Sequence, residues 1–260
     1  SAPHEIMSPP HMRADCITSP ASPKRVLITL LTGLALAGLA LLIDAPVATF
    51  CQRFQPAGDL HLGGDLKRTL EWLQQFGDIA TCIIIALCIW LLDPANRRNL
   101  WRALLALLAS GLAVQALKMF AGRPRPRVVF GHPKPGYDAV VQFTGPLREY
   151  PLPRTSASGL TEYASRHAWE FWNHIGSDLW SFPSSHTSAA AGLAVILARL
   201  YPPLRPLLWT LVAIVGTSRV LLGAHFPSDV IAGAAIGYAF TALLFRLSPP
   251  QTSNRTLASG

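Results

Sequence analysis

The sequence predicts an all-α fold: a bundle of six transmembrane helices with a long outer loop between the third and fourth helices. Half of the 260 residues are hydrophobic, only 14% are charged, and the mean hydropathy is +0.33. The apolar residues are gathered into six runs, which is typical of chains that cross a bilayer. Aromatic residues suited to the membrane interface stand near the run ends: Trp72, Trp90, Trp101, Tyr201 and Trp209.

The first run, Val26–Ile43, is uncharged and lies between Lys24-Arg25 and Asp44. Its length approaches the ~20 residues that a helix needs to cross the hydrocarbon core, so we expect the first transmembrane helix here. A cleaved signal peptide is the competing interpretation, because a basic pair precedes the run and small residues follow it. Residues 1–23 are rich in Pro, Ser and His and are predicted to form a flexible tail.

Five further runs complete a domain that we expect at residues 24–247, followed by a second tail at 248–260. The runs are Ile79–Leu92, Ala103–Leu117, Ala189–Leu200, Leu207–Thr217 and Val230–Phe245. Several are shorter than a membrane span, and runs of ~10 to 14 residues also fit buried helices of soluble proteins. We attribute the shortening to polar residues with a chemical role at the run ends. In the last run, Gly233 and Gly237 have the four-residue spacing that lets two helices approach closely.

The basic residues predict how the bundle is oriented. If six helices alternate in direction, one side carries Lys24, Arg25, the Arg97–Arg102 cluster, Arg199, Arg205 and Arg246. The positive-inside rule makes this side cytoplasmic. Both termini are then expected inside, and the opposite run ends face the outer, periplasmic side of a bacterial-type inner membrane.

The net charge of +8 does not indicate a nucleic-acid partner, because the basic residues lie at run ends and no nucleic-acid-binding module is recognisable. Anionic lipid in the bilayer is the partner that this charge favours, and no protein partner is predicted. The cysteines imply neither a metal site nor a disulfide framework, since Cys16, Cys51, Cys82 and Cys88 lack the necessary spacing.

The third run ends in a basic motif. Lys118 closes the run, and Arg125 follows after six residues, between Pro124 and Pro126, which favour an extended segment. Such a segment can direct an ammonium and a guanidinium group at one anion. Basic side chains that reach from a helix end to the membrane surface are the alternative.

The fourth run begins directly after Pro183-Ser184-Ser185-His186. Ser184 or Ser185 can cap the helix, so that the free N–H groups of its first turn face a bound anion with His186 beside it. A helix cap with an incidental histidine is the alternative.

The third motif joins the fifth and sixth runs. Arg219 ends the fifth run, His225 lies in the turn, and Asp229 begins the sixth run. A carboxylate that holds Nδ1–H leaves Nε2 free and basic, which is the arrangement of a histidine nucleophile. A structural ion pair is the alternative. The three motifs together supply cations, histidines and a carboxylate suited to displacement at a phosphoryl group without a metal ion or other cofactor.

The three motifs in this order resemble the tripartite signature of the type-2 phosphatidic acid phosphatase and vanadium haloperoxidase superfamily, over about residues 100–245. The resemblance implies that His225 Nε2 attacks phosphorus to give a phosphohistidine, that Asp229 orients the ring, and that His186 protonates the leaving oxygen and then activates water. It also implies a phosphate-binding set: Lys118, Arg125, Ser184, the backbone N–H near Ser185, and Arg219. Ser185 departs from the family pattern, which has glycine there, and a serine would be strained if the position needed a positive φ.

The segment between the first two motifs, residues 128–182, is too long for a plain connection. Within it, Leu160–Ile175 is predicted to form a surface helix that places Trp169, Phe171 and Trp172 in the headgroup layer and gates lipid entry. A solvated loop whose aromatic residues cover the bundle is the alternative.

With the apolar runs, the resemblance implies an integral membrane phosphatase that hydrolyses a lipid phosphomonoester or diphosphate. The implied substrate classes are polyprenyl diphosphate, phosphatidylglycerophosphate, phosphatidate and lipid A. Transfer of the phosphoryl group to another lipid is a related alternative. A soluble vanadate-dependent haloperoxidase and a catalytically inactive membrane scaffold are alternatives from other classes.

Overall fold

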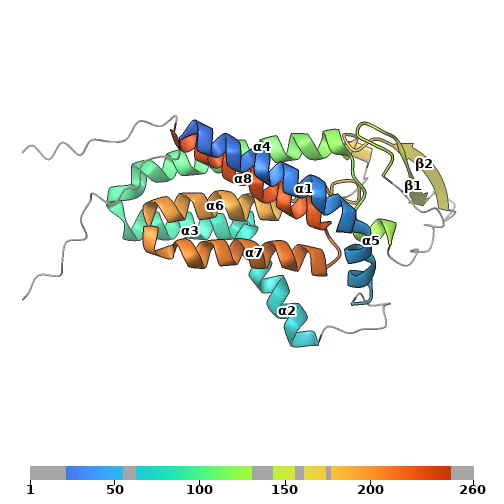
Figure 1. Cartoon of the computed structure of the whole chain (residues 1–260), viewed down its shortest axis with the longest axis horizontal. Helices are drawn as coiled ribbons and strands as arrows, with labels where there is room; N and C mark the ends of the chain where they lie inside the picture. Colours follow the sequence, from blue (N-terminus) through green and yellow to red (C-terminus); the bar gives the residue numbers. More distant parts are fainter. Residues whose placement is uncertain (1–21, 55–62, 131–142, 156–160, 174–176, 247–260) are drawn as a thin grey trace, which may run out of the picture.

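The computed structural model describes residues 22–54, 63–130, 143–155, 161–173 and 177–246. These residues form an elongated bundle of helices with a two-stranded hairpin at one end (Figure 1). Apart from Ser22 and Pro23, the two tails expected from the sequence lie outside the described residues.

The six apolar runs all lie in helices. These are α1 (Pro23–Gln52), α3 (Ile79–Leu92), α4 (Arg97–Ala121), α6 (Ser185–Leu200), α7 (Arg205–Leu221) and α8 (Pro227–Arg246). The shorter elements are α2 (Gly64–Leu73), α5 (Pro126–Val129) and the 3-10 helices η2 (Gln74–Gly77), η3 (Pro94–Asn96), η4 (Phe171–Asn173) and η5 (Pro202–Leu204). The helix α3 coincides with its run because Asp78 caps its start and Asp93-Pro94 follows its end.

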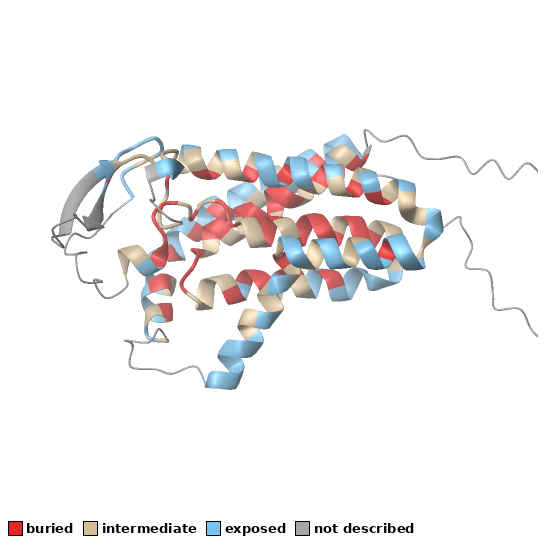
Figure 2. Ribbon diagram, turned by 180° about the vertical axis from the view of Figure 1, so that it is seen from behind, coloured by how far each residue is buried: buried red, intermediate tan, exposed pale blue. Residues whose placement is uncertain are grey.

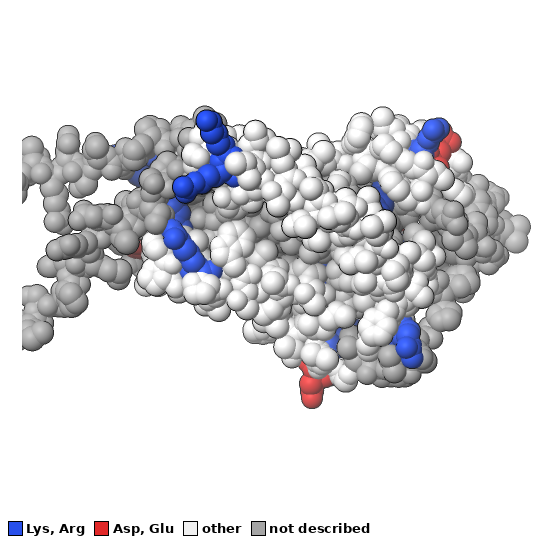
Figure 3. Space-filling model, viewed as in Figure 1, with Lys and Arg blue, Asp and Glu red and all other residues white. Residues whose placement is uncertain are grey.

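Four helical segments among the described residues are long and apolar enough to cross a membrane: Pro23–Gln52, Pro94–Val129, Pro202–Leu221 and Pro227–Phe245. A fifth is added if Gly64–Gly77 and Ile79–Leu92, which are bent by 60° relative to each other, count as one span. The helix α6 has 16 residues and is shorter than a full span. The expected number of six spans therefore stays a prediction. Figure 3 shows a largely uncharged middle, with Lys and Arg toward the two ends.

The helix α6 is the centre of the bundle and packs against α4, α7 and α8. Buried residues gather in the middle of the bundle (Figure 2). Ten of its 16 residues are buried. The close approach expected from Gly233 and Gly237 is present between α8 and α6. A Cβ atom at Gly237 would lie 2.1 Å from the carbonyl oxygen of Ser188, and one at Gly233 would lie 2.5 Å from that of Ser184. The helix α1 covers the other side of α8.

The outer segment contains a hairpin that the sequence did not predict. The strands β1 (Tyr150–Thr155) and β2 (Thr161–Arg166) pair antiparallel. The surface helix predicted at Leu160–Ile175 is therefore wrong in its described part, which holds β2 and η4, and the fold is mostly helical rather than all-α. The reason is tertiary: β1 supplies hydrogen-bond partners for β2, and the buried side chains of Tyr150, Ala168 and Leu179 form a cluster that lies beside Gly122 at the end of α4.

Candidate active site

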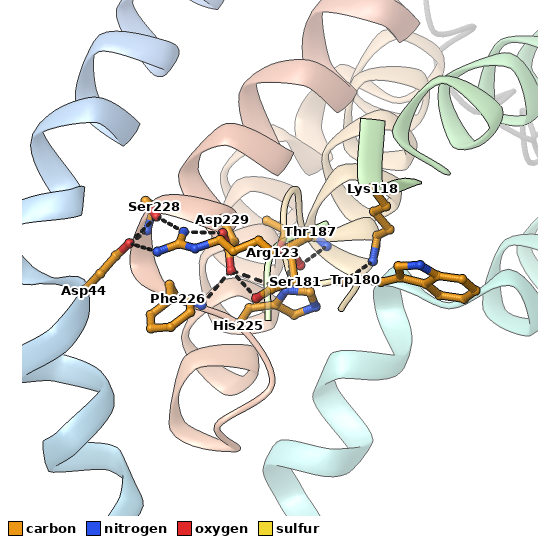
Figure 4. Close-up of polar contacts among 11 residues, drawn as sticks. Asp44, Lys118, Arg123, Trp180, Ser181, Thr187, His225, Phe226, Ser228 and Asp229 are labelled. Carbon is orange, nitrogen blue, oxygen red and sulfur yellow. Dashed lines mark hydrogen bonds and ion pairs between the residues drawn. The ribbon is translucent and has the colours of Figure 1, made fainter. Parts of the chain in front are cut away.

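The predicted site residues meet at the end of the bundle that carries the hairpin. Lys118 lies in the last turn of α4, His225 lies just before α8, and Asp229 lies in the first turn of α8 (Figure 4). Arg219 lies in the last turn of α7. Arg125 precedes α5 in an extended conformation (φ −76°, ψ 152°), as its flanking prolines predicted. These four helix ends carry residues of the first and third sequence motifs, and the start of α6 adds Ser184, Ser185 and His186 of the second motif.

The imidazole of His225 is completely buried and held in one tautomer. Its Nδ1 lies 2.7 Å from the carbonyl oxygen of Ser181, and because a carbonyl only accepts, Nδ1 carries the proton. Nε2 is buried without a hydrogen-bond partner among the described residues. Burial lowers the pKa of His225 to about 3, against the opposing effect of Asp229, so the ring is neutral near pH 7 with a free lone pair on Nε2.

The carboxylate of Asp229 is fixed by several donors and touches the ring indirectly. Its Oδ2 lies 3.8 Å from Nδ1 of His225, which is too long for a hydrogen bond. Oδ2 instead accepts from the hydroxyl of Ser181 at 2.5 Å and from the N–H of Phe226 at 2.9 Å. Asp229 therefore acts on the ring through its charge and by fixing Ser181, whose carbonyl makes the direct contact.

Ser184 is the residue that caps α6. Its hydroxyl accepts from the N–H of Thr187 at 3.4 Å, and its own N–H donates to the carbonyl of Asp229 at 3.0 Å. Ser185 is the first helical residue, and among the described non-glycine residues only Leu147 has a positive φ. Serine in place of the family's glycine is therefore unstrained here.

The second histidine, His186, lies in the first turn of α6 against η2. A Cβ at Gly77 would lie 2.1 Å from the carbonyl oxygen of His186, so only glycine allows this approach. From the same 3-10 helix, Gln74 Oε1 accepts from Arg219 Nη1 at 2.6 Å. The short helix η2 thus packs against both α6 and α7 beside the site.

Three cations act electrostatically on the histidines: Lys118 and Arg125 on both rings, and Arg219 on His186. Lys118 is 3% exposed and donates to the carbonyl of Trp180 at 3.0 Å, and Arg125 is 8% exposed. The Nε atoms of Arg125 and Arg219 are buried without a partner among the described residues. The charges of Lys118, Arg125 and Arg219 act on one another and on His186. Such a cluster of buried donors can hold an anion.

Several residues of the site were missed by the sequence analysis: Asp44, Gln74, Arg123, Ser181 and Ser228. Arg123 donates to Asp229 Oδ1 at 2.6 Å and to Asp44 Oδ2 at 2.8 Å. Asp44 could have been predicted as a site residue, because it is a carboxylate next to an apolar run. Ionisable groups inside a membrane are rare and usually have a charged or polar partner.

The apolar helices and the buried histidine and cation cluster at one end define an integral membrane protein with a polar site at the end of its helical bundle. The chain belongs to the PAP2 superfamily, whose family model matches residues 99–253. Among the described residues, no group of three or more His, Cys, Asp or Glu side chains is arranged to hold a metal ion.

The chain is similar to two curated bacterial proteins over most of its length. It is 28% identical over 235 residues to lipid A 1-phosphatase of Rhizobium etli, covering 80% of this chain and 83% of that protein. It is 28% identical over 251 residues to phosphatidylglycerophosphatase B of Escherichia coli K12, covering 85% and 94%. The crystal structure of a transmembrane PAP2-type phosphatidylglycerolphosphate phosphatase from Bacillus subtilis has the same fold, with a TM-score of 0.50, 17% identity and coverage of 86% and 94%.

Proposed function

We propose that this protein is a membrane phosphatase that hydrolyses a phosphomonoester or diphosphate of a lipid. The observation that carries the proposal is His225, a buried neutral imidazole whose Nε2 is free and whose Nδ1 proton is held by Ser181. Lys118 and Arg125 are close enough for their charges to act on this ring. The names of the curated relatives, a lipid A 1-phosphatase and a phosphatidylglycerophosphatase B, support a lipid phosphate as the substrate class.

In the proposed reaction, His225 Nε2 attacks phosphorus as the bond to the leaving oxygen breaks, and His186 donates a proton to that oxygen. The phosphohistidine is then hydrolysed by a water molecule that gives its proton to His186. The equatorial oxygens are held by Lys118, Arg125, Ser184, the backbone N–H near Ser185, and Arg219. Each well-placed donor of this kind lowers the barrier by roughly 3 to 4 kcal/mol, so no metal ion or other cofactor is required.

The same proposal includes the placement in the membrane. The domain at residues 24–247 crosses the membrane six times if α6 and the bent α2–α3 pair are counted as spans. The basic residues at the start of α1, α4 and α7 and at the end of α6 lie away from the site, and the positive-inside rule places them in the cytoplasm. The site then faces the outer side of an inner membrane, where the substrate lies in the outer leaflet.

The test is phosphate release from a panel of purified lipid phosphates in detergent: polyprenyl diphosphate, phosphatidylglycerophosphate, phosphatidate and lipid A. We expect release from at least one of them, and its abolition in both His225→Ala and His186→Ala. Wild-type rates in either variant would remove the assigned roles. Substrate labelled with 32P should leave alkali-stable label on the wild-type protein and none on His225→Ala. Label found in a second lipid in place of free phosphate would instead indicate transfer between lipids.

A further inference from the structure

A buried polar network links α1 to the site and uses a cation that is separate from the phosphate-binding set. Arg123 Nη1 donates to Asp229 Oδ1 at 2.6 Å and to the hydroxyl of Ser228 at 2.7 Å (Figure 4). Its Nη2 donates to Asp44 Oδ2 at 2.8 Å. The side chain of Arg123 is 11% exposed, and those of Asp44 and Asp229 are 5% and 0% exposed.

Arg123 determines how the carboxylate of Asp229 is turned. Oδ1 is taken by the guanidinium group, which leaves Oδ2 to accept from the hydroxyl of Ser181 and the N–H of Phe226. Ser181 in turn holds Nδ1 of His225 through its carbonyl. A charge-assisted bond to a completely buried carboxylate is short and directional, so without it only the two bonds to Oδ2 would hold the carboxylate of Asp229.

Asp44 fixes Arg123 from the opposite side and anchors the start of α8. Its Oδ1 accepts from the N–H of Ser228 at 3.0 Å, and its Oδ2 also accepts from the hydroxyl of Ser228. An unpaired N–H in the first turn of α8 is thereby satisfied by a carboxylate from α1. Because Asp229 follows Ser228 directly, this contact also places the carboxylate of the site.

We propose that Arg123 and Asp44 are positioning residues for the His225–Asp229 pair, which act by orienting Asp229 and Ser181 rather than by binding phosphate. The inference rests on the proposed function. Both terminal nitrogens of Arg123 are engaged by protein groups, and its guanidinium carbon lies over the ring of Phe226, 4.0 Å from the ring centre. Loss of either residue should therefore lower kcat and leave KM unchanged.

The test measures kcat and KM for variants of two arginines that lie four residues apart, Arg123 and Arg127. The substrate is the lipid phosphate that the wild type hydrolyses fastest. Arg123→Gln should lower kcat by about 10²-fold, the order of effect expected for a ~1 Å misplacement of a reacting group, with KM unchanged. Arg123→Lys keeps the charge but cannot bridge two carboxylates in the same way, so it should recover part of the loss. Arg127→Gln is the matched control: Arg127 donates to Ser177 and Asp178 rather than to Asp229, and its side chain is 44% exposed, so solvent screens its charge and kcat should change by less than about threefold.

Asp44→Asn keeps the Arg123–Asp229 ion pair and removes one buried charge, so it tests the inference if Arg123→Gln does not fold. Asp44→Asn should lower kcat about tenfold with KM unchanged. In the double variant with Arg123→Gln, the fold-decrease in kcat should be smaller than the product of the two single decreases, because the two residues belong to one network. Gel filtration and thermal unfolding in detergent check folding.

Full activity of Arg123→Gln beside an inactive His225→Ala would overturn this inference and leave the proposed function standing. A raised KM in Arg123→Gln with kcat unchanged would also overturn it, because Arg123 would then bind the substrate. A wild type that releases no phosphate from any lipid of the panel would overturn the proposed function itself.

Discussion

The close contact between α8 and the start of α6 allows a direct test of the site geometry. Gly233 lies one turn after Asp229, and a Cβ there would lie 2.5 Å from the carbonyl oxygen of Ser184. Ordinary contacts begin at 3.4 Å, so Gly233→Ala must move the two helices apart by about 0.9 Å. The obstacle is backbone and cannot rotate away. Because the N–H of Ser184 bonds to the carbonyl of Asp229 at 3.0 Å, the movement acts directly on the site.

We expect Gly233→Ala to lower kcat by about 10²-fold, since misplacement by ~1 Å has an effect of this order. It should also reduce the free energy of unfolding by ~1 to 3 kcal/mol through overpacking. Gly111→Ala is the matched control, because a Cβ at Gly111 in α4 meets nothing within 4 Å. It should keep full turnover and gain up to ~1 kcal/mol. Phosphate release and thermal unfolding measure both variants. Equal turnover by the two would show that the site does not depend on this contact.

Three further predictions concern the metal, the pH and the membrane surface. Turnover should survive EDTA because side-chain cations balance the phosphate charge; complete loss that magnesium restores would contradict the mechanism. Burial lowers the pKa of His225 to about 3 from 6.5, so between these pH values the unfolded chain binds one more proton. Stability should therefore fall on acidification by up to about 1.4 kcal/mol per pH unit, and the unfolding midpoint of His225→Asn should be less sensitive to acid in this range. Replacing Trp169, Phe171 and Trp172 by alanine should slow turnover of lipid in vesicles more than that of a short-chain lipid phosphate in solution, since Phe171 and Trp172 are 58% and 60% exposed. Equal effects on both substrates would favour a plain covering role.

The helices could be predicted from the sequence because their signals are local. Each apolar run lies inside one helix, and polar or proline residues such as Asp78 and Pro94 mark the ends. The convergence of the three motifs followed from the same runs, because helices that alternate in direction place Lys118, His186 and Arg219 at one end. Local pattern and alternation together were sufficient for this part of the structure.

The contacts that orient the site could not be predicted, because their partners are distant in sequence. Arg123 is separated from Asp44 by 79 positions and from Asp229 by 106. In the sequence, Arg123 reads as one more basic residue at a membrane end, and Asp44 reads as the end of the first apolar run. The helix α1 in fact continues to Gln52, so that Asp44 lies inside the bundle with a cation and a helix start to bind.

The charged groups around the site are balanced only in part. Arg123 lies between the carboxylates of Asp44 and Asp229, so this trio carries one net negative charge. The three cations of the proposed phosphate site are Lys118, Arg125 and Arg219, and these six groups, four basic and two acidic, carry a formal charge of +2 when all are ionised. A phosphomonoester carries about −1.5 to −2 near pH 7. In the proposed reaction the substrate would neutralise a cluster whose excess charge is unfavourable at membrane depth. A phosphodiester, with one negative charge, would leave the cluster positive, so the charge balance supports the proposed substrate class, a lipid with a terminal phosphate.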